Sequence, residues 1–329
     1  MAFPRRQFLL GAAASLGLPA LPKLAHAQLY PSRPIALVVP FPAGGPVDTL
    51  ARFLAERMRA SLGQPLVIEN ISGAGGSIGV GRVARASPDG YTLIIGITST
   101  HVFNGAMYSL QYDVLNDFEP VALVTDSSQL IVGKKNLPPG DLSELIAWLK
   151  ENPNKATSAT AGVGSPHHIF GVLFQNATGT RFQFAHYRGG APATQDLVAG
   201  QVDLAIADQV TTLPQIRAGN IKVYAFTGKS RLPSLPDVPT AEEAGLPGFR
   251  TSIWNAIWAP KGTPKRITAR LNAAVMDALA DPASRSRLAE LGHYTVPRES
   301  HSAEVLYALH RAEIEKWWPI IKAANIRAD

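Results

Sequence analysis

Short apolar runs alternate with helical patterns along most of this chain, and this alternation constrains the fold more than any other feature. The runs 35–39, 66–68 and 92–97 are typical of buried strands, and a mostly apolar face repeats at helical spacing over 48–62. Chains in which strands alternate with helices build βαβ units around a largely parallel sheet. The N-terminal third therefore predicts an α/β unit.

The same alternation starts again near Val121 and predicts a second unit. A Pro-rich stretch, 232–247, precedes one more apolar run at 253–258, and mostly helical patterns follow it. If these last helices pack on the first unit, the chain crosses between the units twice, near 126–130 and 248–252, and the two crossings form a hinge. We therefore predict two α/β lobes with a ligand cleft between them, lobe 1 being 28–127 with 250–329 and lobe 2 being 128–249. Within lobe 2 we expect strands at 130–132, 156–159, 182–187 and 202–206 and helices at 142–150, 166–177 and from 192.

Residues 1–27 have the pattern of an export signal. Arg5 and Arg6 form a charged tip, an apolar run covers 8–21, and 25–27 reads Ala-His-Ala, a small-x-small cleavage site. The Arg pair resembles a twin-arginine signal, and general secretory export is the competing interpretation. Both predict a periplasmic protein. A membrane anchor is disfavoured, because prolines and Lys23 interrupt the run before the ~20 apolar residues that a spanning helix needs.

The amino-acid composition limits which ligands the protein binds and which covalent or metal sites it contains. Removal of the export signal takes away three basic residues and no acidic ones, which lowers the formal net charge from +6 to +3. A weak, scattered positive charge argues against nucleic acid as a partner and suits a small anionic ligand. The chain has no cysteine, so disulfides and thiolate metal sites are excluded.

A Gly-rich loop, 40–48, follows the first predicted strand and leads directly into a helix. Gly44 and Gly45 allow a tight turn, and the helix offers unpaired N–H groups at its positive end. Because open α/β sheets bind ligands at the carboxyl ends of strands, this loop is a candidate anion cradle. An ordinary turn, with Pro46 as the first helical residue and Asp48 satisfying orphan donors, explains the pattern equally well.

Two further Gly-rich loops follow later strands. The loop 73–81 has the spacing of neither a dinucleotide fingerprint nor a phosphate loop, so we interpret it as a turn that lets the next helix pack closely. The loop 161–168 lies between a strand and a helix of lobe 2 and repeats the pattern of the first loop. Two such loops facing each other across a hinge would hold two carboxylates of one ligand, or clamp one carboxylate from both sides.

Eight sequence blocks follow one another along the whole mature chain. They are Tyr30-Pro-Ser-Arg-Pro-Ile35, Val38-Val-Pro-Phe-Pro-Ala-Gly-Gly45, Gly73-Ala-Gly-Gly-Ser77, Pro88-Asp-Gly-Tyr-Thr-Leu93, Gly162-Val-Gly-Ser-Pro-His-His168, His186-Tyr-Arg-Gly-Gly190, Gly200-Gln-Val-Asp-Leu204 and Trp258-Ala-Pro-Lys-Gly-Thr-Pro264. Together they resemble the Bug family, the extracytoplasmic solute-binding receptors of tripartite tricarboxylate transporters. The resemblance implies a periplasmic-binding-protein-like fold, or Venus flytrap, whose two α/β lobes capture a small carboxylate.

The resemblance also indicates which residues contact the ligand. In the family, a carboxylate is held largely by backbone amides and ordered water from two loops, which match Phe41 to Gly45 and Gly162 to His168 here. Pro46 stands where many members carry a residue with an N–H, so one donor is missing from the first loop. Side chains at the far end of the pocket set selectivity. The predicted ligand-binding residues are Phe41, Ala43, Gly44, Gly45, Thr98, Ser99, His101, Gly164, Ser165, His168, Tyr187, Arg188 and Asp208.

Among the selectivity candidates, Arg188 gives the most specific prediction about the ligand. If its side chain points into the pocket, it pairs with a second carboxylate, and the preferred ligand is a diacid. If it points outward, it is a solvated surface charge. The sequence leaves both orientations open.

The residues that could form a metal site or a catalytic site do not have the required sequence spacing. The eight histidines show no H-E-x-x-H spacing, so we expect no metal. Ser165, His168 and Asp208 include the residue types of a hydrolase triad, but no G-x-S-x-G elbow is present, and Ser165 precedes Pro166 as a helix cap does. We expect no catalytic residues and no cofactor.

We therefore predict a monomeric, non-enzymatic receptor that binds a small carboxylate and docks transiently on the membrane subunits of a transporter. A sensor of the same ligand that docks on a sensor kinase is the first alternative, because it differs in its partner and not in its pocket. A periplasmic hydrolase is the second alternative. The resemblance does not name the carboxylate.

Overall fold

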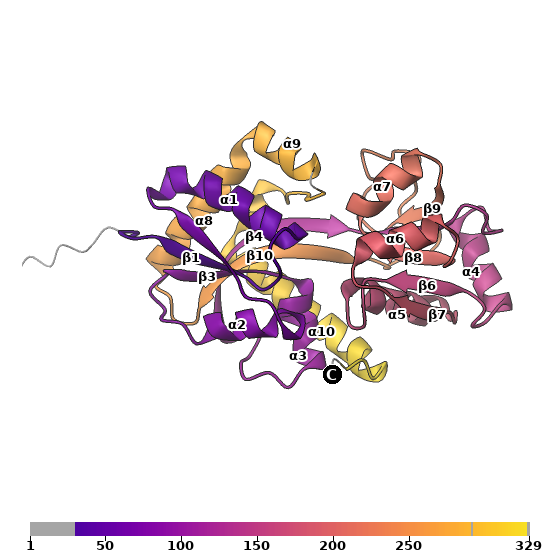
Figure 1. Cartoon of the computed structure of the whole chain (residues 1–329), viewed down its shortest axis with the longest axis horizontal. Coiled ribbons are helices and arrows are strands. Elements are labelled where there is room, and N and C mark those ends of the chain that lie inside the picture. The colour runs from indigo at the N-terminus through magenta and orange to yellow at the C-terminus, as the bar shows by residue number, and fades with distance from the viewer. Residues whose placement is uncertain (1–29, 291, 328–329) are drawn as a thin grey trace, which may run out of the picture.

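The computed structural model describes residues 30–290 and 292–327, and the expected export signal, residues 1–27, lies outside them. The chain forms two lobes joined side by side, each built around its own five-stranded sheet (Figure 1). The predicted two-lobed α/β fold is confirmed. None of the helices among the described residues combines the length and apolarity needed to cross a membrane.

The first sheet has the strand order β2-β1-β3-β10-β4. It combines strands from both ends of the chain: β1 (Ile35–Val39), β2 (Leu66–Asn70), β3 (Thr92–Ile97), β4 (Phe118–Ser128) and β10 (Ser252–Pro260). Its helices are α1 (Pro46–Leu62), α2 (Ser77–Ala84), α3 (Asn104–Met107), α8 (Lys265–Ala280), α9 (Pro282–Glu290) and α10 (Ala303–Ala323), with short helical turns η1 (Ala74–Gly76), η2 (Ser99–Phe103) and η3 (Arg298–His301).

The second sheet has the strand order β7-β6-β8-β5-β9. Its strands are β5 (Leu130–Lys134), β6 (Thr157–Thr160), β7 (Gln183–His186), β8 (Leu204–Ala207) and β9 (Ile221–Phe226). Its helices are α4 (Leu142–Glu151), α5 (Pro166–Thr178), α6 (Gly190–Val198) and α7 (Gln209–Arg217). The chain changes sheets between Ser128 and Leu130 and again between Phe226 and Ser252, while the lobe boundaries at residues 127/128 and 249/250 remain a prediction.

Both sheets are mixed, although the sequence predicts largely parallel ones. In the first, β10 runs antiparallel to β3 and β4, and in the second, β5 runs antiparallel to β8 and β9. The reason is the pair of crossings. β4 carries the chain into the second lobe, and β10 carries it back, so the two strands lie side by side in opposite directions.

Strand direction places the ends of the parallel strands. β3 is antiparallel to β10 and therefore runs with β4 toward the second lobe, and β1 and β2 are parallel to β3. In the second lobe, β5 runs away from the crossing, so β8 runs back toward the first lobe, as do β6 and β7. The carboxyl ends of all six parallel strands thus meet at the junction of the lobes.

The crossing segments are tied to one another by buried side chains. Thr227 Oγ1 donates to the Thr251 carbonyl at 2.8 Å and accepts from the Gln129 N–H at 2.8 Å. Thr251 Oγ1 in turn donates to Thr227 Oγ1 at 3.0 Å. All three side chains are buried. The Thr227 and Thr251 hydroxyls at the hinge are therefore satisfied by hydrogen bonds between the crossing segments.

Helix α10 spans the two lobes on one side of the hinge. It packs along β4 and η2 of the first lobe and reaches α5 of the second (Figure 1). The buried Trp317 ring lies 5.3 Å from Phe103 of the first lobe and 5.4 Å from Phe170 of the second, measured between ring centroids. This aromatic contact gives the lobes a third connection besides the two crossings.

Candidate functional site

The loop after β1 is held in place by the buried carboxylate of Asp48. Asp48 Oδ2 accepts from the Gly44 N–H and from Arg52 Nε, both at 2.8 Å, and Oδ1 accepts from Asn70 Nδ2 at 2.9 Å. Asn70 Nδ2 also donates to the Phe41 carbonyl at 3.1 Å. The hydrogen bond from Arg52 is the main reason that the pKa of Asp48 falls to about 2. The loop is therefore fixed by an ionised carboxylate and not by its glycines alone.

This arrangement changes the expected role of Gly44. Its N–H already donates to Asp48, so the amide is not offered to a ligand, as the capping alternative predicted. Gly44 retains a conformational role, since its φ of +82° favours glycine. The open donors are the first-turn amides of α1, at Val47 and Asp48, because this helix begins with no side-chain cap. The N-terminal end of α1, its darkest part, points toward the second lobe (Figure 1).

The loop after β6 is closed on itself. The Gly164 N–H donates to His168 Nδ1 at 3.1 Å, and the His168 N–H donates to Ser165 Oγ at 3.4 Å. The Ser165 N–H donates to the Gly162 carbonyl at 3.2 Å. Burial lowers the pKa of His168 to about 4, so its Nδ1 is an acceptor at neutral pH. In this conformation the Gly164, Ser165 and His168 amides donate within the loop, and their contact with a ligand stays a prediction.

The loop after β7 supplies an open helix end instead. Helix α6 follows Gly189 with no side-chain cap, which leaves the first-turn amides of Gly190 and Ala191 without intrahelical partners. Tyr187 Oη donates to Asp196 Oδ2 at 2.7 Å, so the tyrosine hydroxyl is engaged within the lobe. Arg188 is exposed and has no ion pair within the described residues. The positive end of α6 and the Arg188 guanidinium thus lie on one loop.

Two predicted selectivity residues of the first lobe point inward. Thr98 and His101 have no exposed surface. Thr98 Oγ1 accepts from the Trp254 N–H at 3.0 Å, and the His101 ring stacks on Trp258 with centroids 3.7 Å apart. The π-helical turn η2 places these side chains in the core beside β10, and their contact with a ligand stays a prediction. Ser99 is half-buried and stays accessible.

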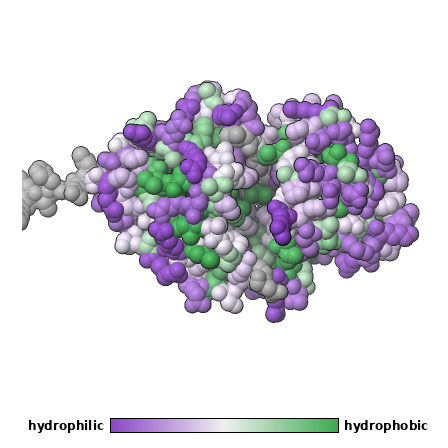
Figure 2. All heavy atoms as spheres, viewed as in Figure 1, coloured by the Kyte–Doolittle hydropathy of each residue, from purple (hydrophilic) through white to green (hydrophobic). Residues whose placement is uncertain are grey.

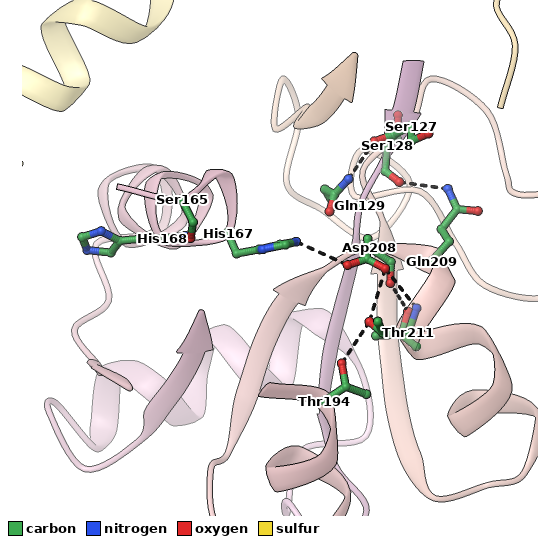
Figure 3. A network of polar contacts seen from close by, with 11 residues as sticks. Ser127, Ser128, Gln129, Ser165, His167, His168, Thr194, Asp208, Gln209 and Thr211 are labelled. Atoms are coloured by element: carbon green, nitrogen blue, oxygen red, sulfur yellow. Dashed lines mark hydrogen bonds and ion pairs between the residues drawn. The ribbon is translucent and has the colours of Figure 1, made fainter. Parts of the chain in front are cut away.

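Asp208 lies at the junction of the lobes. It faces His167, which was not among the predicted ligand-binding residues. Its Oδ1 accepts from the Thr211 N–H at 2.9 Å and caps α7, while Oδ2 lies 3.7 Å from Nε2 of His167 (Figure 3). His167 and His168 point in different directions from the start of α5 (Figure 3). In the sequence, only the adjacency of His167 and His168 points to a histidine at this place, and it does not reveal which of the two rings faces Asp208.

Several residues at this end of the second sheet carry buried polar atoms without a partner. Among the described residues, Gln129 Oε1, His167 Nε2 and Gln209 Oε1 are such atoms, and Figure 3 shows the His167 ring directed at Asp208 and the Gln209 amide directed away from it. Buried polar groups of native proteins are nearly always hydrogen-bonded, so this concentration indicates a place where a ligand or water binds. A cavity of about 10 Å³ adjoins it, lined by Thr160 and His167 among others.

A larger cavity lies elsewhere. It measures about 500 Å³ between α5 and the C-terminal end of α10, and His168, Arg181 and Arg327 line it. The His168 ring therefore faces this cavity and not Asp208. The space-filling view shows apolar surface at the boundary between the lobes, flanked by hydrophilic residues (Figure 2).

The arrangement can bind a small anion but forms no relay for acyl transfer. Ser165 Oγ serves as the cap of α5, His168 Nδ1 accepts from Gly164, and Asp208 faces the other histidine. Two helix ends, of α1 and α6, are uncapped and positive, and they belong to opposite lobes. No group of three or more His, Asp or Glu side chains in the described part of the chain is placed to hold a metal ion.

Replacement of Asp48 by Ala is expected to lower the free energy of unfolding by about 1–3 kcal/mol, because the Gly44 and Asn70 donors lose a charged acceptor. Glu56→Ala on the exposed face of the same helix removes the same charge and serves as the control. Urea unfolding monitored by tryptophan fluorescence measures both. Equal stability of the two variants would contradict the role given to Asp48.

Comparison with known proteins identifies the family. Residues 50–326 match the family model described as "Tripartite tricarboxylate transporter family receptor". Protein BugT of Bordetella pertussis is 37% identical over 303 residues, which cover 92% of each chain.

Two solved structures share both fold and sequence with this chain. MatC from Rhodopseudomonas palustris, with bound malate, is 41% identical with a TM-score of 0.76, covering 89% of this chain and 100% of that one. A second R. palustris protein, solved with adipate, is 35% identical with a TM-score of 0.77, covering 91% and 99%. The resemblance seen in the sequence is confirmed, and the chain belongs to the tripartite tricarboxylate transporter receptor family, which includes the Bug proteins.

Proposed function

We propose that this protein is a periplasmic receptor that captures a small carboxylate between its lobes and delivers it to a tripartite transporter. The observation that carries the proposal is the pair of uncapped helix N-termini, α1 and α6, which strand direction brings to the junction from opposite lobes. Such ends bind carboxylates through backbone N–H groups and the helix dipole. The related structures with malate and adipate support the ligand class.

The proposed contacts follow from the groups that remain open. On the first lobe they are the amides of the α1 first turn, the loop Phe41 to Gly45 that positions them, and Ser99. On the second lobe they are the α6 amides, Arg188 and Asp208. Tyr187 contributes its ring, since its hydroxyl is engaged by Asp196.

The wider setting of the receptor is also proposed. Its relatives are solute-binding proteins, so a non-enzymatic role fits better than hydrolysis. Export through the twin-arginine or general route, action as a monomer and transient docking on membrane subunits agree with that role. Docking on a sensor kinase instead would leave the pocket unchanged.

A thermal-shift screen of mono- and dicarboxylic acids, each paired with its neutral amide, tests the proposed function. The melting temperature should rise with an acid and not with its amide, because only the ionised group matches the helix ends, and binding to the native state stabilises it. The bound acid then serves in a titration by calorimetry. Equal affinity for an acid and its amide would contradict the proposal.

Arg188→Ala tests whether the ligand carries a second carboxylate. If Arg188 pairs with that group, affinity for a diacid should fall by about 1.5–3 kcal/mol, while a monoacid of the same length loses little. Arg181→Ala is the matched control, since Arg181 precedes β7 and Arg188 follows it, and both are exposed. Calorimetric titration gives both affinities. An equal effect on both ligands, or none, removes Arg188 from the pocket.

A further inference from the structure

His167 and Asp208 face each other without forming a direct bond. Their Nε2 and Oδ2 atoms are 3.7 Å apart, longer than a hydrogen bond, and the ring is nearly buried, with 11% of its side chain exposed. A single oxygen or nitrogen placed about 2.8 Å from both atoms would bond to both. The pair is therefore spaced for an intervening polar atom.

The two oxygens of Asp208 have different roles. Oδ1 is fixed by the Thr211 N–H at 2.9 Å and the Thr211 hydroxyl at 3.3 Å, and Thr194 Oγ1 donates to that hydroxyl at 3.0 Å. Within residues 30–290 and 292–327, Oδ2 accepts no hydrogen bond and lies 3.7 Å from His167 Nε2. A Cβ at Gly190 would lie 3.1 Å from Oδ2, so the glycine leaves this oxygen open next to the uncapped end of α6.

The surrounding groups are mainly acceptors. Gln129 Nε2 donates to the Ser127 carbonyl at 2.7 Å, and Gln209 Nε2 donates to the Ser128 carbonyl at 2.9 Å. These bonds fix both amides and leave their Oε1 atoms buried and unpartnered, with the Gln209 amide directed away from Asp208 (Figure 3). A second carboxylate would be repelled by Asp208, and a methylene would leave Asp208 Oδ2 without a donor. A hydrogen-bond donor on the ligand would satisfy Oδ2.

We propose that His167 and Asp208 form a subsite for a hydroxyl or amino group on the bound carboxylate, which makes them determinants of ligand selectivity. Because Oδ2 adjoins the α6 end that holds a carboxylate, the group lies on the neighbouring carbon, and the ligand is a 2-hydroxy or 2-amino acid. The inference rests on the proposed function and narrows its ligand class. Burial lowers the pKa of His167 against the opposing charge of Asp208, and an uncharged ring suits a hydroxyl that both donates and accepts.

Matched acids that differ in one substituent test the subsite in the full mature chain. L-malate and L-aspartate are each compared with succinate, and L-lactate with propionate, by calorimetric titration. The substituted acid should bind at least about tenfold more tightly, the scale of a hydrogen bond to a charged group. Tighter binding of malate than of aspartate would assign the subsite to a hydroxyl, and the reverse would assign it to an amine.

The variants His167→Phe and Asp208→Asn should each bring that preference close to unity. Asn retains the ability to cap α7, so a folding defect in one variant does not decide the test. Asp203→Asn is the matched control, since Asp203 precedes β8 and pairs with Lys134 at 2.6 Å, and it should keep the preference.

Equal affinity for the substituted and plain acids in the wild type overturns the subsite and leaves the carboxylate receptor standing. An undiminished preference in both variants also overturns it. If no acid of the panel binds, this inference falls together with the proposed ligand class.

Discussion

The antiparallel pair of β4 and β10 is the constraint on which the rest of the structure depends. One strand carries the chain into the second lobe and the other returns it, and their pairing spans β4 from Phe118 to Ser128. Once these directions are set, the parallel strands of both sheets must end at the junction. The buried hydroxyls of Thr227 and Thr251 join the crossing segments by hydrogen bonds. The open helix ends and Asp208 reach the junction as a consequence of strand direction.

Strands that alternate regularly with helices along the chain could be predicted from the sequence. β1 and β3 have the expected bounds, because their short apolar runs are buried. β9 was not predicted, and β4 begins before the point where the pattern was seen to restart. β4 leads directly into β5 with no helix between them, so it breaks the alternation that marks βαβ units. β9 follows α7 but lies at a sheet edge, and its run includes Lys222 and partly exposed positions, so its apolar pattern is weak.

The positions of the candidate loops were easier to predict than the hydrogen-bond partners of the groups on them. Loop positions follow from strand ends, but the partner of each amide depends on side-chain geometry. The Gly44 amide turned out to serve Asp48, as the capping alternative allowed. The burial of His101 was not predicted, because η2 is a π-helical turn, which helical periodicity does not anticipate. His167 was overlooked beside His168 because neighbouring helical residues point about 100° apart, and the phase of α5 is set by packing.

The central claim is that the lobes close around a bound carboxylate. Small-angle X-ray scattering of the purified mature protein, with and without a saturating acid from the screen, tests it most directly. The account predicts a smaller radius of gyration with ligand, because closure about the β4 and β10 crossings brings the two sheets together. An unchanged scattering profile at saturation would contradict it.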